Sequence, residues 1–278
     1  MSSTILSCGE PDSSVWKIEG KESTLFIGGT IHALRHDDYP LPPQFDRAYS
    51  LADKLVFERN MSDEALAIAS AQMIITGTYQ DERTLENVLS REVFKALRAE
   101  CEKNGLDIRD IHSHKPSLAL LVLSVSVLER LGAFETGVDR YFYALATKDN
   151  KSLDVFESVG EQIHEMMNIG AGYEDEYIMA SLKDIQNMEE DLDEIIQGWR
   201  NGSPDAMIEN LNDLCKNSPL LYKAMCADRN SAWMPKIESL LADNTVEFVL
   251  VGAEHLYGPN GVLTLLKDKG YAVEKLKM

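Results

Sequence analysis

Apolar and polar residues alternate near the start of the chain, and the pattern then changes to a longer period. The stretch WKIEGKESTLFIGG, residues 16–29, alternates around a polar turn at Gly20, which predicts a β-hairpin. After Pro42 and Pro43, apolar residues recur at i, i+3, i+4 and i+7, which predicts a helix. The run LVFE at 55–58 then indicates a short strand that ends on a carboxylate.

The middle of the chain, from residue 62 to about 245, is predicted to be mainly helical because apolar residues keep a period near 3.6. Its longest apolar run, LALLVLSVSVL at 118–128, is too short to span a bilayer. We therefore expect a buried core helix that begins at Pro116. The run SLDVFE at 152–157 predicts one short extended segment within this region.

The C-terminal region repeats the plan of the N-terminal one. VEFVLVG at 246–252 is almost continuously apolar, which is typical of a strand covered on both faces of a parallel sheet. GVLTLLKDKG then predicts a helix that ends at Gly270, and YAVEKL predicts a final strand. Each end of the chain thus contains a strand, a Gly-x-x-His segment, a loop with proline, a helix and a second strand.

These elements predict one α/β domain over residues 1–278, with a helical insertion from about 62 to 245. Strand-helix-strand units place their strands in parallel through right-handed crossovers. We therefore expect a mixed, largely parallel central sheet built from both chain termini, with a large helical middle region. Ligands of such sheets bind beyond the carboxyl ends of the strands, where His32 and His255 are expected to meet.

Composition excludes several classes of partner. Hydrophobic residues make up 44% of the chain and charged residues 26%, which is typical of a globular protein and argues against disorder. The formal net charge is −19, so binding to nucleic acid is not expected, because that requires clustered Lys and Arg. An anionic membrane surface is disfavoured for the same reason.

The four cysteines do not form a CxxC pair and are too few for a disulfide framework in a chain of 278 residues. Cys101 and Cys215 fall at apolar positions of predicted helices. We expect both to be buried packing residues.

Two histidines and one glutamate form the candidate catalytic centre. His32 and His255 each follow a strand in the spacing Gly-x-x-His, and Glu58 ends the strand LVFE. The glycine is expected to allow a sharp turn and a close approach to a ligand. Two imidazoles and a carboxylate are a common ligand set for a catalytic divalent ion, which lowers the pKa of bound water from 15.7 toward about 7.

The residues alone leave open which histidines bind a metal. A histidine at a strand end is often a hydrogen-bonded loop residue, and four further histidines are available: His36, His112, His114 and His164. His112 and His114 have a spacing that could chelate an ion, although an ordinary loop before Pro116 is the favoured interpretation. The acidic segment at 172–199 is interpreted as a solvated helix face rather than a cation site.

Several motifs together resemble one protein family. They are GGTIH at 28–32, FERN at 57–60, GVDRYF at 137–142, FESVGEQ at 156–162, DRN at 228–230 and VGAEHLYGPNGVLTLLKDKGYAVEKL at the C-terminus. The chain resembles the TraB/GumN family, which includes the Tiki metalloproteases and is related to the erythromycin-esterase-like and ChaN-like folds. The resemblance covers most of the chain.

What the resemblance implies is a metal-dependent hydrolase that uses Mn²⁺ or Co²⁺, with Zn²⁺ also possible. His32 and His255 become candidate metal ligands, and Glu58 a ligand or general base. Further pocket residues that would bind substrate are implied by two of the motifs: Asp139, Glu157 and Gln162. Arg229 and Asn230 of DRN are similar to a polar pair of the family and could bind a substrate carboxylate or an oxyanion.

Each of these polar residues also has a structural interpretation. Asp139 could be a first-turn residue favoured by the helix dipole, and Glu157 could cap the helix that follows it. Arg229 and Asn230 could form a bridge between helices.

The expected reaction is hydrolysis, with a peptide or another small molecule as substrate. Two alternatives stay open: a non-catalytic protein that sequesters a peptide, as resemblance to pheromone-shutdown members would imply, and a metal-independent esterase in which His32 or His255 is the general base. The substrate, the native metal and the oligomeric state do not follow from the sequence.

The compartment is also open. Members of the family often carry a signal peptide or a membrane tether, and this chain shows neither. A periplasmic or extracellular location is favoured if a leader is missing from the sequence, and a cytoplasmic one otherwise.

Overall fold

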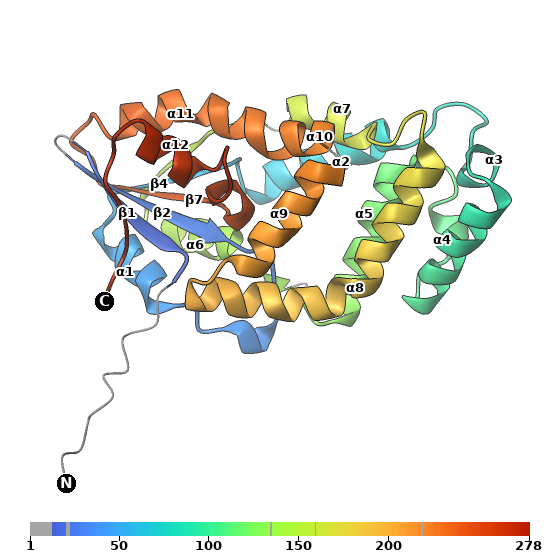
Figure 1. Ribbon diagram of the computed structural model, residues 1–278, viewed down its shortest axis with the longest axis horizontal. Coiled ribbons are helices and arrows are strands. Elements are labelled where there is room, and N and C mark those ends of the chain that lie inside the picture. Colours follow the sequence, from blue (N-terminus) through green and yellow to red (C-terminus); the bar gives the residue numbers. More distant parts are fainter. Residues whose placement is uncertain (1–12, 21–22, 134, 159, 218) are drawn as a thin grey trace, which may run out of the picture. The chain divides into compact units, whose positions relative to one another are not determined.

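Strands from both ends of the chain lie in one sheet. The computed structural model describes residues 13–20, 23–133, 135–158, 160–217 and 219–278 (Figure 1). The chain divides into two compact units, which we call the first unit (residues 1–30, 40–56 and 194–278) and the second unit (residues 31–39 and 57–193). The expectation that the chain is one domain stays a prediction.

The sheet of the first unit interleaves the two chain ends. Its strands lie in the order β4-β7-β2-β1-β8. Their bounds are β1 Val15–Glu19, β2 Thr24–Thr30, β4 Lys54–Phe57, β7 Glu247–Gly252 and β8 Val273–Lys275. β1 is antiparallel to β2, which confirms the predicted hairpin, and it is also antiparallel to β8. β2 and β7 are parallel, with Phe26 opposite Phe248.

Helices cover both faces of this sheet. The bounds are α1 Pro43–Leu51, α9 Asp205–Asn217, α10 Pro219–Tyr222, the π-helix η3 Lys223–Ala227, α11 Asp228–Leu240, the 3-10 helix η4 Ala253–Leu256 and α12 Val262–Asp268 (Figure 1). On one face, Phe45 of α1 packs 5.4 Å from Trp199 and 6.2 Å from Phe248, measured between ring centroids. On the other face, Leu256 and Ala253 of η4 pack against Gly29.

The second unit is mainly helical. It contains α2 Asp63–Gly77, α3 Leu85–Val88, α4 Arg91–Lys103, α5 Pro116–Arg130, α6 Val138–Lys148, α7 Gly160–Met167 and most of α8 Glu174–Asn201, with the 3-10 helices η1 His36–Asp38 and η2 Ile108–Asp110 and the strands β3 Ala33–Leu34, β5 Glu135–Thr136 and β6 Ser152–Val155. One apolar cluster joins α4, α5 and α8 through residues such as Leu97, Leu123 and Ile178. The helix predicted to begin at Pro116 is therefore confirmed as α5.

Helix ends follow the expected signals. Ser62 accepts a hydrogen bond from the Ala65 amide and Ser90 from the Val93 amide, so α2 and α4 begin with side-chain caps. Gly270 has a φ of +88°, the left-handed conformation that ends α12. Together, these elements confirm a mixed α/β fold with a mostly parallel central sheet and a large helical middle region.

The prediction that both cysteines are buried is right for one and wrong for the other. Cys101 is buried in the cluster of α4, whereas Cys215 is exposed. The apolar stripe of α9 follows Met207, Leu211 and Leu214, so position 215 falls beside the stripe and faces solvent.

Among the described residues, no helix combines the length and the apolar character needed to cross a membrane.

Candidate functional site

The backbone around His32 is fixed by the segment that begins α6. β3 and β5 pair antiparallel, with Ala33 opposite Thr136. The Val138 amide donates to the carbonyl of Ile31 at 3.0 Å. A side chain at Gly137 would place its Cβ 2.3 Å from the His32 carbonyl oxygen, so only glycine permits this approach.

The side chain of His32 is oriented by a buried carboxylate. Nδ1 of His32 lies 2.6 Å from Oδ2 of Asp139, and the two side chains are 50% and 6% exposed. An ionised carboxylate can only accept hydrogen bonds, so Nδ1 carries the proton and the neutral ring has its lone pair on Nε2. Asp139 lies in the first turn of α6, where the helix dipole stabilises its negative charge.

Glu58 and Glu157 are brought together by backbone pairing. The Phe156 amide donates to the carbonyl of Phe57, and the Glu157 amide donates to the carbonyl of Glu58, both at 2.9 Å. Glu58 is buried directly after β4, and Glu157 is half-buried after β6. Residues 57–58 of the FERN motif and residues 156–157 of the FESVGEQ motif therefore run side by side. The side chain of Gln162 lies outside the part of the chain that the structure describes.

One small recess joins three of the predicted site residues of the second unit. Its lining includes His32, Glu58 and Asp139 with Arg59 and Met61, and its volume of about 10 Å³ has room for one water-sized group. The recess adjoins a larger open cavity of about 560 Å³ that His32 and Asp139 also line. The second unit thus combines an oriented imidazole and a carboxylate in one concave place.

His255, in the first unit, is held by Asn230 of α11. The Asn230 amide group donates to the carbonyl of His255 at 3.1 Å and to that of Asn260 at 2.8 Å. Because Nδ2 donates twice, the other amide atom must be the oxygen, which lies 2.7 Å from His255 Nδ1. Nδ1 therefore carries a proton. Both His255 and Asn230 are 1% exposed.

The other nitrogen of His255 faces a cation. Arg229 Nη1 lies 2.8 Å from His255 Nε2, so the guanidinium donates to its lone pair. The same guanidinium lies 5.0 Å from the ring centroid of Trp233, whose ring packs 4.6 Å from the His255 ring. Arg229 also donates to the Met225 carbonyl. In this arrangement Arg229 occupies the side of His255 that a metal ion would need.

The chemistry of the residues fits the implied metal in part. Within the described residues, no group of three His, Cys, Asp or Glu side chains is placed to hold an ion. His32, oriented by Asp139, and Glu58 nevertheless supply nitrogen and oxygen donors of the kind that divalent metals accept. His255 fits only after Arg229 leaves its Nε2. His32 and His255 belong to different units, and their convergence stays a prediction.

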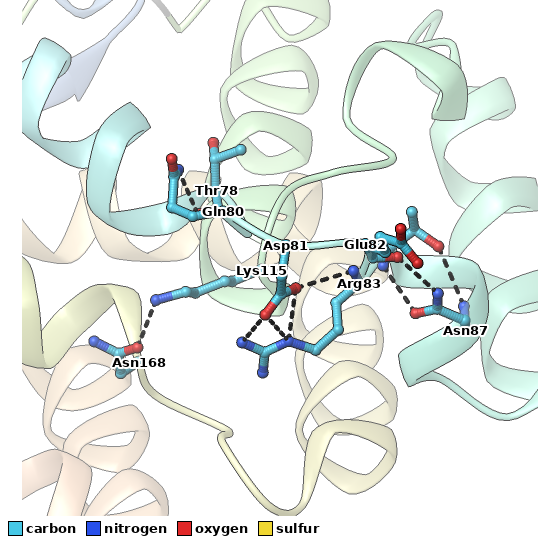
Figure 2. A network of polar contacts seen from close by, with 9 residues as sticks. Thr78, Gln80, Asp81, Glu82, Arg83, Asn87, Lys115 and Asn168 are labelled. Atoms are coloured by element: carbon cyan, nitrogen blue, oxygen red, sulfur yellow. Dashed lines mark hydrogen bonds and ion pairs between the residues drawn. The ribbon is translucent and has the colours of Figure 1, made fainter.

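His112 and His114 each contact a different polar group. His112 Nδ1 donates to the Arg109 carbonyl at 2.7 Å, whereas His114 Nδ1 lies 3.5 Å from the Thr78 hydroxyl. Burial lowers the pKa of His114, and His112 adds to this effect. Figure 2 shows the polar contacts next to them, including the ion pair of Asp81 with Arg83 and the bond from Lys115 to Asn168 at 2.7 Å. The two imidazoles thus have different partners.

Sequence reasoning missed two cations at the predicted site. Arg59 lines both the recess and the cavity, and Arg140 lines the cavity. Both belong to motifs that were singled out, FERN and GVDRYF, and each is next to a predicted site residue. That position beside Glu58 or Asp139 is the signal that could have identified them.

The fold and the site define an α/β protein with a polar recess at the carboxyl end of a strand. Residues 14–275 match the sequence model of the TraB/PrgY/gumN family, and the chain belongs to that family. It is 25% identical over 244 residues to the uncharacterized protein YbaP of Escherichia coli (strain K12) and to that of Shigella flexneri, covering 86% of each chain. No solved structure matches the sequence significantly.

Proposed function

We propose that the protein is a metal-dependent hydrolase that acts on peptides with Mn²⁺ or Co²⁺. The observation that carries the proposal is the His32–Asp139 pair, which lines one recess with Glu58. Family membership is consistent with it but does not itself assign an activity. A divalent ion, when bound, would activate water and polarise a carbonyl.

The residues of the chain have distinct tasks in this proposal. Asp139 keeps the proton on Nδ1 of His32, which leaves Nε2 as the ligand atom. Asn230 likewise keeps the proton on Nδ1 of His255, the second metal ligand predicted from the sequence. Glu58 is a ligand or the general base. In the proposal, Arg229 leaves Nε2 of His255, to which it is hydrogen-bonded, and binds the developing negative charge of the carbonyl oxygen.

A specific observation favours a second candidate, a metal-independent esterase. The hydrogen bond from Arg229 to His255 Nε2 keeps a cation where an ion would bind. The His32–Asp139 pair has the geometry of an oriented general base, in which the carboxylate fixes the tautomer and stabilises the imidazolium. In this candidate His32 would accept the proton of the attacking water directly.

Cleavage of a peptide library tests the proposal and separates the alternatives. Metal-free protein is incubated with the library, with and without added Mn²⁺, and products are identified by mass spectrometry. We expect cleavage only with metal, and its loss in His32→Ala but not in His164→Ala, a control histidine that is exposed on α7. Metal-independent cleavage of esters would support the esterase. Peptide binding without cleavage in metal-loaded protein would support a sequestering role.

A further inference from the structure

The cavity beside His32 has a composition that selects a class of ligand. It has a volume of about 560 Å³ and opens next to the His32–Asp139 pair. Besides that pair, its lining includes two arginines and a set of apolar side chains: Arg59, Arg140, Met61, Leu66, Leu128 and Ala133. A cavity with a few polar groups among apolar ones is typical of a small-ligand site.

The two arginines bring two positively charged groups to a cavity lining that also holds the Asp139 carboxylate, in a chain whose formal net charge is −19. Arg59 is exposed and forms neither a hydrogen bond nor an ion pair with any residue of the described part of the chain. Arg140 Nη2 lies 3.1 Å from Oδ1 of Asp63, whose side chain is 93% exposed. An ion pair this exposed contributes little free energy, so a ligand can displace Asp63.

The arginines and the apolar residues together match a carboxylate that is next to an apolar group. Guanidinium groups bind carboxylates through paired, charge-assisted hydrogen bonds. Leu66 of α2 and Leu128 of α5 are half-buried and line the cavity with Met61, whose flexible side chain adapts to different shapes. An apolar side chain of a ligand would be removed from water against these three residues.

We infer that this cavity binds a carboxylate of the substrate through Arg59 and Arg140, with an apolar side chain of the substrate against Met61, Leu66 and Leu128. The inference rests on the proposed function for the assignment of peptides as substrates. The carboxylate is either the C-terminal one of a short peptide or that of an acidic side chain. In either case the peptide bond next to it lies at His32, so the site selects peptides by a negative charge near the cleaved bond.

Binding of three dansylated peptides to the full chain without metal tests this inference. The first is dansyl-Gly-Ala-Ala-Ala-Leu with a free carboxylate, the second is its C-terminal amide, and the third is the amide with Glu in place of the last Ala. Fluorescence anisotropy gives each Kd. We expect the free acid to bind at least about tenfold more tightly than the neutral amide, because a charge-assisted hydrogen bond contributes this much. Tight binding of the Glu peptide alone would assign the carboxylate to a side chain, tight binding of the free acid alone would assign it to the C-terminus, and tight binding of both would mean that the cavity accepts either.

Variants of the two arginines test whether these side chains bind the carboxylate. Arg59→Gln and Arg140→Gln are each expected to reduce the preference for the acid severalfold, and the double variant to abolish it. Arg98→Gln is the control, because Arg98 is an exposed arginine of α4 that pairs with Glu102 and does not line the cavity. Melting curves verify that every variant is folded.

The outcomes separate the inference from the proposed function. Equal binding of all three peptides, no binding of any peptide, or a preference for a carboxylate that survives in the double variant would overturn the inference, whether or not Mn²⁺ supports cleavage of the library. A preference that depends on the two arginines, without cleavage in the presence of metal, would support the inference and overturn the hydrolase.

Discussion

Nδ1 of His32 lies 2.6 Å from Oδ2 of Asp139, although 107 residues separate them in the sequence. The contact depends on the backbone around it, because the Val138 amide and the close approach of Gly137 place α6 against His32. It determines which ring nitrogen is protonated, and so which one can bind a metal or accept a proton. The candidate site therefore depends on a pair of residues rather than on one histidine.

Replacement of Asp139 by Asn should weaken metal binding. Asn has nearly the same size but no charge, so it no longer fixes the tautomer of His32 or raises its basicity. Loss of such a partner typically lowers metal affinity by about 10- to 100-fold, and we expect this for Mn²⁺ measured by calorimetry. Asp110→Asn, at an exposed position of η2, is the control and should leave the affinity unchanged. Equal affinities in the two variants would contradict this role.

Asn230→Ala should destabilise the protein. The amide of Asn230 satisfies two carbonyl groups and orients His255; its two contacts with His255 are buried and the one with Asn260 is partly buried. Their loss should lower the free energy of unfolding by about 3 kcal/mol, because buried groups are left without partners. Denaturant titration measures this effect. Asn212→Ala on the exposed side of α9 should change the free energy by less than about 0.5 kcal/mol.

Arg229→Gln should raise the affinity for Mn²⁺ and lower turnover. The guanidinium competes with a cation for Nε2 of His255, so its removal relieves both the hydrogen bond and the charge repulsion. We expect an increase in affinity of about tenfold, equivalent to about 1.4 kcal/mol. An affinity that falls instead would show that Arg229 supports the metal site, and an unchanged rate of cleavage would exclude its role at the carbonyl.

Glu247 should make the stability of the protein depend on pH. It is fully buried at the start of β7, with Lys54 Nζ 3.1 Å from Oε1, yet neither of its oxygens completes a hydrogen bond. Burial raises the pKa of Glu247, and Lys54 opposes this only in part. A raised pKa in the folded state means that the protonated form is favoured there. Its contribution to stability is present below the unfolded-state pKa and is lost as the pH rises through the folded-state pKa.

Glu247→Gln removes this titration. At pH 7 the variant should be more stable than the parent by on the order of 1 kcal/mol, and the difference should disappear near pH 4, where the parent carboxyl is protonated. Thermal unfolding at both values measures it. Glu274→Gln in β8, where the side chain is exposed, should show no such dependence. A variant that is less stable at pH 7 would indicate that the ion pair with Lys54 outweighs desolvation.

The local structure near both chain ends could be predicted because each element depends on short-range signals. The alternation around Gly20 predicted β1 and β2, and the apolar run at 246–252 predicted β7. The position of β7 between β4 and β2 could not be predicted in the same way, because strand order depends on packing between residues far apart in the sequence. The reason for a glycine at position 29 could not be predicted either. Leu256 and Ala253 pack so close to Gly29 that a side chain there would collide with them.

The residue types of the candidate site could also be predicted, but not their partners. The motifs identified His32 and Asp139 separately, and their hydrogen bond follows only from the fold. The tautomer of His255 depends on two carbonyl groups that orient Asn230, which no spacing reveals. Arg59 was missed because an exposed arginine is usually a solvated surface residue.

Titration of metal-free protein with Mn²⁺, followed by the electron paramagnetic resonance of the free ion, tests the central claim most directly. The account predicts one tight site per chain that is lost in His32→Ala and Glu58→Gln and retained in His164→Ala, with melting temperatures that show all variants folded. Wild-type protein that binds no stoichiometric Mn²⁺, or variants of His32 and Glu58 that bind it as the wild type does, would contradict the account.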